Sequence, residues 1–157
     1  YINPASQELY ADFYNGMLGT ALTWEKIFEQ TDRDINLQRV MNFMSFSEKT
    51  GLNDWIPDRA IGPTEDTLYE KEKDYNDGQL SLILNKPLPE IQTMATAEKR
   101  AILMKHRKEQ LRKLIDVYYQ ERGWTHQGIP KIDTLKKIGL WEFMTEEARA
   151  AIKAMGR

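Results

Sequence analysis

Residues 96–123, TAEKRAILMKHRKEQLRKLIDVYYQERG, decide the fold class of this chain. Apolar side chains recur in the stretch at the three- and four-residue spacing of an α-helix. Thr96 is a residue type that caps helices, and Gly123 can end a helix. The stretch therefore predicts one helix of about 26 residues, roughly 39 Å long. The side that we expect to face a core carries Ile102, Leu103, His106, Leu111, Leu114, Ile115 and Tyr118.

Two more helices are predicted on the amino-terminal side of this stretch. Pro4 fits the first turn of a short helix, and Asn15-Gly16 offers a stop for it. Thr23 can cap a longer helix that runs on to Gly51. The charged residues Asp32-Arg33-Asp34 either interrupt this helix or lie on its surface. The apolar positions of these two helices are Leu9, Phe13, Met17, Ile27, Phe28, Ile35, Val40, Met41, Met44 and Phe46.

The middle of the chain combines a loop with shorter patterns. Residues 52–64 hold prolines and apolar side chains, which predicts an ordered loop packed by its own side chains. Residues 64–76 predict a helix that the turn Asp77-Gly78 closes, whereas residues 80–89 are too short a run to assign by periodicity. The apolar side chains of the loop are Leu52, Trp55, Ile56 and Ile61.

The carboxyl-terminal part predicts two brief helices. Asp133 can cap the first, which ends at Gly139, and Thr145 can cap the second. No pair of strand-like segments joined by a hairpin turn stands out. We therefore expect an all-α fold, an irregular multi-helix domain with long ordered loops that takes in residues 1–157 as a single domain.

Composition narrows the chemistry that this chain can perform by itself. It has 157 residues and no cysteine, which removes thiolate zinc sites, cysteine-ligated iron–sulfur clusters and thiol nucleophiles. Its formal charge of −2 makes nucleic acid a poor default partner. No apolar run approaches the roughly 20 residues of a membrane span, and no secretory signal opens the chain, so a cytoplasmic location is expected.

Candidate metal sites are weak. His106 and His126 have no histidine partner at helical spacing, so a structural role is expected for each. The acidic strings 32–36 and 74–78 suggest calcium loops, but each lacks the glycine at the sixth place and the glutamate at the twelfth. We therefore expect neither a histidine-ligated zinc site nor a calcium site.

Other motifs also favour structural roles. Gly16 and Gly19 do not follow a strand and are interpreted as turn residues, not as a phosphate-binding loop. The basic residues of the long helix indicate a solvated or subunit-facing surface more than a nucleic-acid footprint. The sequence thus assigns no catalytic, cofactor-binding or metal-ligating residue. These basic residues are Lys105, His106, Arg107, Lys108, Arg112 and Lys113, and packing roles are expected for Trp24, Trp55, Trp124 and Trp141.

Three segments have distinctive patterns. They are FYNG and LTWE within residues 13–25, INLQRVMN at 35–42 followed by DWIPDR at 54–59, and YYQERGW, GIP and LKKIGL within 118–140. In this order they resemble the C-terminal helical domain of the tungsten- or molybdenum-containing aldehyde:ferredoxin oxidoreductase family. The last segment is the most specific, and the resemblance covers nearly the whole chain.

The resemblance implies a division of labour. In the family a bis-pterin tungsten or molybdenum centre and a [4Fe–4S] cluster are held by segments that would precede Tyr1, which is consistent with a chain that lacks cysteine and does not begin with Met. The implied chain binds no cofactor and is inactive alone. Its implied partners are the N-terminal domains of the same enzyme, which would oxidise aldehydes or related substrates and reduce a ferredoxin-type acceptor.

The residues that carry the resemblance have structural interpretations, and none is expected to be catalytic. Thr23 would cap a helix, Gly123 and Gly139 would end helices, and Pro57 would stiffen a loop. Two arginines are long donors able to bind loop carbonyls or carboxylates. These are Arg39 and Arg59.

A rival hypothesis is an independent helical module that binds a protein through an apolar groove and has no enzymatic activity. The module predicts a stable monomer with a defined partner. The oxidoreductase domain instead predicts exposed apolar surface that self-associates, so a homo-oligomer remains open.

Overall fold

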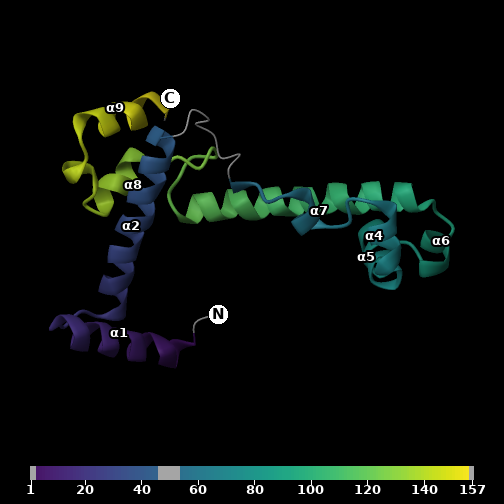
Figure 1. Cartoon of the computed structure of the whole chain (residues 1–157), viewed down its shortest axis with the longest axis horizontal. Coiled ribbons are helices and arrows are strands. Elements are labelled where there is room, and N and C mark those ends of the chain that lie inside the picture. Colours follow the sequence, from purple (N-terminus) through teal and green to yellow (C-terminus); the bar gives the residue numbers. More distant parts are fainter. Residues whose placement is uncertain (1–2, 46–53, 156–157) are drawn as a thin grey trace. The chain divides into compact units, whose positions relative to one another are not determined.

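A computed structural model of the chain describes residues 3–45 and 54–155. Within these ranges the elements are helices, and the extended pairing is limited to one isolated bridge between Trp124 and Pro130. The all-α, multi-helix prediction is confirmed. The chain divides into two compact units, unit 1 with Tyr1–Thr50 and Arg122–Arg157, and unit 2 with Gly51–Glu121 (Figure 1). The assignment of one domain to the whole chain stays a prediction.

Unit 1 begins with helix α1 (Pro4–Leu18). The predicted stop at Asn15-Gly16 is wrong, because the helix runs through both residues and ends before Gly19, whose φ is 65°. The Asn15 side chain instead orders the following loop: its Oδ1 accepts from the Leu22 amide at 2.9 Å, and its Nδ2 donates to the Leu22 carbonyl at 2.8 Å.

Helix α2 (Trp24–Ser45) follows, and its start confirms Thr23 as the cap. The Lys26 amide lies 3.4 Å from Thr23 Oγ1, and hydrogen bonds from backbone and from this hydroxyl lower the pKa of Glu25 in the first turn. The helix continues without a break through Asp32-Arg33-Asp34. The predicted end at Gly51 and the apolar Phe46 lie outside the described residues.

The rest of unit 1 comprises α8 (Ile132–Lys137), the 3-10 turn η2 (Trp141–Phe143) and α9 (Glu146–Met155). Thr145 caps α9 as predicted, since its Oγ1 accepts from the Ala148 amide at 3.2 Å. Asp133 does not cap α8, because the helix starts one residue before it and Asp133 lies in the first turn. The common core of these elements and α2 contains Val40, Phe43, Ile129, Leu135, Leu140, Trp141, Met144, Ala148 and Ile152.

Gly139 ends α8 as predicted. Its φ is 70°, its amide donates to Lys136 O at 2.9 Å, and the Leu140 amide donates to Leu135 O at 2.9 Å. This pair of bonds closes the helix end in a left-handed turn that satisfies two carbonyls.

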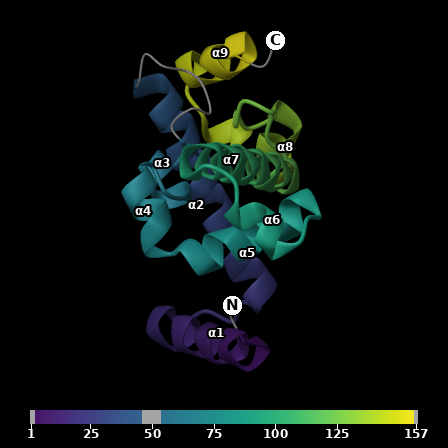
Figure 2. The same ribbon diagram turned by 90° about the vertical axis from the view of Figure 1, so that its right-hand side faces the viewer.

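Unit 2 is built on the predicted long helix, α7 (Thr96–Glu121). Helices α4 (Asp66–Lys71), α5 (Lys73–Leu84) and α6 (Leu88–Gln92) gather beside its amino-terminal part (Figures 1 and 2). Their core contains Tyr69, Leu80, Ile91 and Leu103. Thr96 is the first residue of α7 and not its cap, since its hydroxyl donates to the Glu70 carboxylate, a bond that lowers the pKa of Glu70.

The prediction that Asp77-Gly78 closes a helix is wrong. Both residues lie in the middle of α5, and the chain turns earlier, at Glu72, and later, at Asn85, whose φ is 51°. A buried position for Asn76 and Asp77 overrides the turn preference of an Asp-Gly pair. Helix α5 thereby absorbs residues 80–84, which periodicity left unassigned.

The predicted loop over residues 52–64 contains a short helix, α3 (Asp58–Ile61). Trp55 and Ile61 are half-buried and Pro63 is buried, while Ile56 is exposed, so the described part is packed mainly by those three side chains. Leu52 lies outside the described residues.

Candidate functional site

The first candidate site is a set of polar contacts made by one face of α2, which we call the α2 anchor: Asp32, Arg33, Asn36 and Arg39 with their partners. Asn36 is buried, and its Oδ1 accepts from Trp124 Nε1 at 2.9 Å. The Asn36 amide group also donates to Asp32 O at 2.8 Å. Two family-like segments, INLQRVMN and RGW, therefore meet through one buried hydrogen bond.

Arg39 makes the second contact of the α2 anchor. Its Nε donates to the Gly128 carbonyl at 2.9 Å, which confirms the predicted role as a donor to a loop carbonyl. Its guanidinium lies 4.7 Å from the Trp124 ring and 5.0 Å from the Phe43 ring, measured to the centroids. These contacts fit a cation–π arrangement that fixes the 124–128 turn against α2. Arg59, the other predicted donor, is exposed.

Two charge-assisted bonds complete the α2 anchor. Arg122 NH1 donates to Asp32 Oδ1 at 2.6 Å, and Arg33 Nε donates to the Ile138 carbonyl at 2.6 Å. Asp32 belongs to an acidic string that suggested calcium, but in a continuous helix the string cannot wrap around an ion. Its spacing to Asn36 and Arg39, i, i+4 and i+7, is the periodic signal that could have revealed this face.

The turn that the anchor holds depends on Gly123. Its φ is 66°, and its carbonyl accepts a hydrogen bond from Thr134 Oγ1 at 2.7 Å. A Cβ added to Gly123 would lie 2.3 Å from Thr134 Oγ1. Gly123 thus follows α7 as predicted, and the reason includes close approach as well as backbone conformation.

In unit 2 the DWIPDR segment and the end of α7 also meet. The Tyr119 hydroxyl donates to the Asp54 carboxylate, and Arg112 lies over the Trp55 ring at 5.4 Å. Pro57 precedes α3 and its carbonyl accepts from the Ala60 amide at 2.8 Å. The residues that carry the family resemblance therefore serve as tertiary contacts in both units.

The second candidate site is a buried charge network in unit 2, formed by Tyr69, Asn76, Asp77, Lys99 and Arg107. Lys99 and Asp77 are each 1% exposed, and Lys99 Nζ lies 2.8 and 3.2 Å from the two Asp77 oxygens. The Tyr69 hydroxyl donates to Asp77 Oδ1 at 2.7 Å. Burial, with the bond to Asp77 and the charge of Asp77, raises the pKa of Tyr69.

The outer members of this network complete its hydrogen bonding. Asn76 Nδ2 donates to the Tyr69 carbonyl at 3.1 Å, and Arg107 NH2 donates to Asn76 Oδ1 at 3.4 Å. Among the described residues, every buried polar side-chain atom has a partner. A sealed and satisfied network holds helices together and has no open position for a substrate. Sequence reasoning missed it because Asp77 was assigned to a turn.

The residues of this chain do not fit the tungsten or molybdenum centre, or the [4Fe–4S] cluster, of the family that the sequence resembles. A [4Fe–4S] cluster needs cysteine thiolates, and the chain has none. Within residues 3–45 and 54–155 no three histidine or acidic side chains gather as a metal-ligand group. His106 is half-buried on α7 and His126 is exposed on the 124–128 turn, in different units.

The third candidate site is apolar. Leu9, Tyr10, Phe13 and Met17 form what we call the α1 stripe, on a side of α1 different from the side that holds the buried Ala11. Phe13 is 66% exposed and Met17 83% exposed. Leu37, Met41 and Met44 form a second exposed row, on the carboxyl-terminal half of α2 and at helical spacing. Contiguous exposed apolar side chains are typical of interaction surfaces.

Comparison with known proteins identifies the family of this chain. No helix in the described ranges combines the length and apolarity needed to cross a bilayer. No curated protein and no solved structure gives a match to the chain. A family model described as "Aldehyde ferredoxin oxidoreductase, domains 2 & 3" matches residues 2–140, which contain the whole α2 anchor and the whole buried charge network. The chain therefore belongs to the aldehyde ferredoxin oxidoreductase family, in the part that forms its domains 2 and 3.

Proposed function

We propose that this chain is a scaffold domain of an aldehyde-oxidising enzyme and that it docks, through the α1 stripe and the exposed row on α2, on the domains that carry the cofactors. In the intact enzyme those domains would hold a bis-pterin tungsten or molybdenum centre and a [4Fe–4S] cluster. The complete enzyme would oxidise an aldehyde, or a related carbon centre, with water and pass the electrons to a ferredoxin-type acceptor.

One observation carries this proposal: an apolar stripe faces water in a chain that belongs to a multidomain enzyme family. Leaving a side chain such as Phe13 or Met17 exposed forgoes the roughly 1.5–3 kcal/mol that its burial contributes. Family membership identifies the occupant that we favour, since domains of one enzyme bury such faces against one another. The absence of cysteine from the chain supports placing the cluster ligands elsewhere in the enzyme.

The chain's own residues then have a mechanical role. The α2 anchor holds α2 against the 122–131 turn through Asn36, Arg39 and Asp32. Asn15 ties the end of α1 to the loop that leads into α2. These bonds give the docking face a defined shape, which reduces the entropy lost on docking.

The experiment compares the whole chain with a surface variant. The wild-type chain should self-associate in analytical ultracentrifugation and should be captured by the cofactor-bearing domains of an aldehyde ferredoxin oxidoreductase-type enzyme. The double variant Phe13→Ser/Met17→Ser should lose about tenfold or more in both, as expected when two large apolar contacts are removed. Phe143→Ser is the matched control, because Phe143 is 87% exposed but lies on η2, outside the stripe.

Two results would contradict the proposal. If the chain stays monomeric and does not bind the cofactor-bearing domains, the result would favour the hypothesis of an independent interaction module. Stoichiometric tungsten, molybdenum or iron in the purified chain, measured by elemental analysis, would contradict the division of labour.

A further inference from the structure

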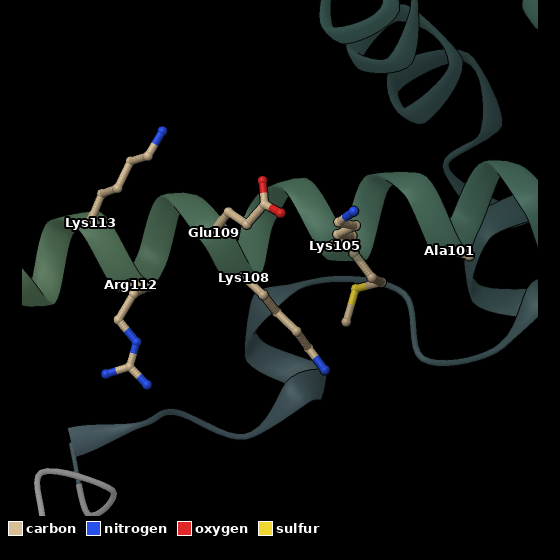
Figure 3. Close-up of a pocket in the computed structure, with 7 residues that line it drawn as sticks. Ala101, Lys105, Lys108, Glu109, Arg112 and Lys113 are labelled. Carbon is tan, nitrogen blue, oxygen red and sulfur yellow. The ribbon is translucent and has the colours of Figure 1, made fainter.

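The exposed face of α7 carries a groove that the proposed function does not use. It is a shallow, open depression of about 640 Å³ lined by seven residues between Ala101 and Lys113 of this one helix (Figure 3). It runs between two parallel rows of side chains at four-residue spacing. The inner row is Met104, Lys108 and Arg112, and the outer row is Lys105, Glu109 and Lys113.

The inner row is already engaged within unit 2. Lys108 Nζ bonds Asp58 Oδ2 at 2.6 Å, and Arg112 lies over the Trp55 ring at 5.4 Å. Met104, the first member of the row, is buried. In Figure 3 Lys108 and Arg112 extend toward the segment that contains α3, whereas Glu109 and Lys113 point the other way. The inner row is therefore a fixed wall of the groove.

The outer row is exposed and alternates in charge. Lys105, Glu109 and Lys113 are all exposed, and within the described part of the chain neither lysine has an ion-pair partner within 4 Å. The two lysines are eight residues apart, which is roughly 12 Å along the helix. The row thus presents a plus, minus, plus pattern over two helical turns.

We propose that this groove receives a helix of a partner protein that carries acidic, basic and acidic side chains at four-residue spacing. Two helices pack when the ridge of one, along every fourth residue, enters the groove between two ridges of the other. Such a ridge would place carboxylates against Lys105 and Lys113, and an ammonium or guanidinium against Glu109. Its apolar flank would cover the methylene groups of the lysines.

The charge pattern also separates this partner from two others. A nucleic-acid backbone is uniformly negative and would meet Glu109 in the middle of the outer row. A second copy of the chain lacks the complementary ridge, because nowhere in the 157 residues does a basic residue have acidic residues both four before and four after it. A different protein with an amphipathic, mixed-charge helix fits best.

The test uses the full chain and synthetic helical peptides of about 18 residues, a length that favours helix formation. One peptide carries Glu, Lys and Glu at four-residue spacing beside a leucine row, and the other carries Lys, Glu and Lys. Labelled chain titrated with the first peptide should show saturable NMR shift changes confined to residues 101–113. The second peptide should bind about tenfold more weakly, as three exposed charge pairs change sign.

Charge-swapped variants complete the test. Lys105→Glu/Glu109→Lys/Lys113→Glu should lose about tenfold in affinity for the first peptide and regain binding to the second. Lys71→Glu, at an exposed position of α4 that does not line the groove, should behave as wild type. Equal binding of both peptides to wild type and swapped chain would overturn the proposal. So would shift changes outside residues 101–113, or tighter binding of a single-stranded oligonucleotide than of the first peptide.

Discussion

The two units of this chain differ in which side chains they bury. Unit 2 hides a lysine and an aspartate almost completely and satisfies both, whereas unit 1 leaves Phe13 and Met17 in water. A buried, fully bonded ion pair shows that unit 2 has a closed core of its own. An exposed apolar stripe indicates that unit 1 has a core to complete with another surface. Unit 2 also leaves apolar side chains exposed, Leu82 and Leu114 among them, so the buried ion pair is what distinguishes the two units. The proposal places the docking face in unit 1 because the α1 stripe lies there.

The largest effect is expected from breaking the closed core of unit 2. Lys99→Met removes the partner of Asp77 and leaves a buried carboxylate uncompensated, which should lower the free energy of unfolding by about 3–5 kcal/mol. Urea unfolding followed by circular dichroism measures the loss. The control Lys105→Met replaces an exposed lysine of the same helix and should change stability by less than about 0.5 kcal/mol. Similar values for the two variants would mean that unit 2 is not closed.

A smaller effect is expected in unit 1 from a matched pair of glycine substitutions. Gly123→Ala places a residue with a Cβ at a positive φ and brings that Cβ too close to Thr134. The substitution should lower the free energy of unfolding by about 1–3 kcal/mol. Gly16→Ala lies inside α1 with open space around the new Cβ, and should stabilise the helix by up to about 1 kcal/mol. Thermal unfolding of both variants checks the opposite signs, and a destabilising Gly16→Ala would argue against a regular helix there.

The smallest expected effect is a pH dependence that belongs to unit 2. The folded state raises the pKa of Tyr69 above its ordinary value of 10.0, so the unfolded chain loses this proton first as the pH rises. Stability should therefore fall above pH 10, with a slope of at most about 1.4 kcal/mol per pH unit. Urea midpoints measured across this range should show a flatter slope for Tyr69→Phe. Tyr75→Phe, at an exposed position of α5, should keep the slope of the wild type.

Local patterns predicted a large part of the helical framework. Helix α7 covers Thr96–Glu121 as its periodicity indicated, although Leu114 and Tyr118, which were expected to face a core, are exposed. Thr23 and Thr145 cap the helices that follow them. Gly139 ends α8 as a glycine in a left-handed turn. These features depend on residues within one or two turns of each other, which is why the sequence reveals them.

The helix at Asp77-Gly78 and the candidate sites, which the sequence patterns did not reveal, depend on contacts between distant residues. Asp77-Gly78 was predicted to be a turn, but Asp77 is held in α5 by Lys99, 22 residues away. The partners of the α2 anchor are more distant still, since Trp124 and Asn36 are 88 residues apart. Periodicity contains no information about such pairs, so the candidate sites could not be assembled from sequence patterns.

By itself the sequence determined an all-helical chain, the extent of its longest helix, the absence of thiol chemistry and the family to which it belongs. Only the tertiary structure decided which charges are buried together, which apolar rows remain in water, and which lysines of α7 keep their charge exposed beside a groove. Helix propensity and capping act within a few residues along the chain. Burial is decided by packing between segments that the chain brings together from far apart, and it is burial that separates a structural side chain from one available to a partner.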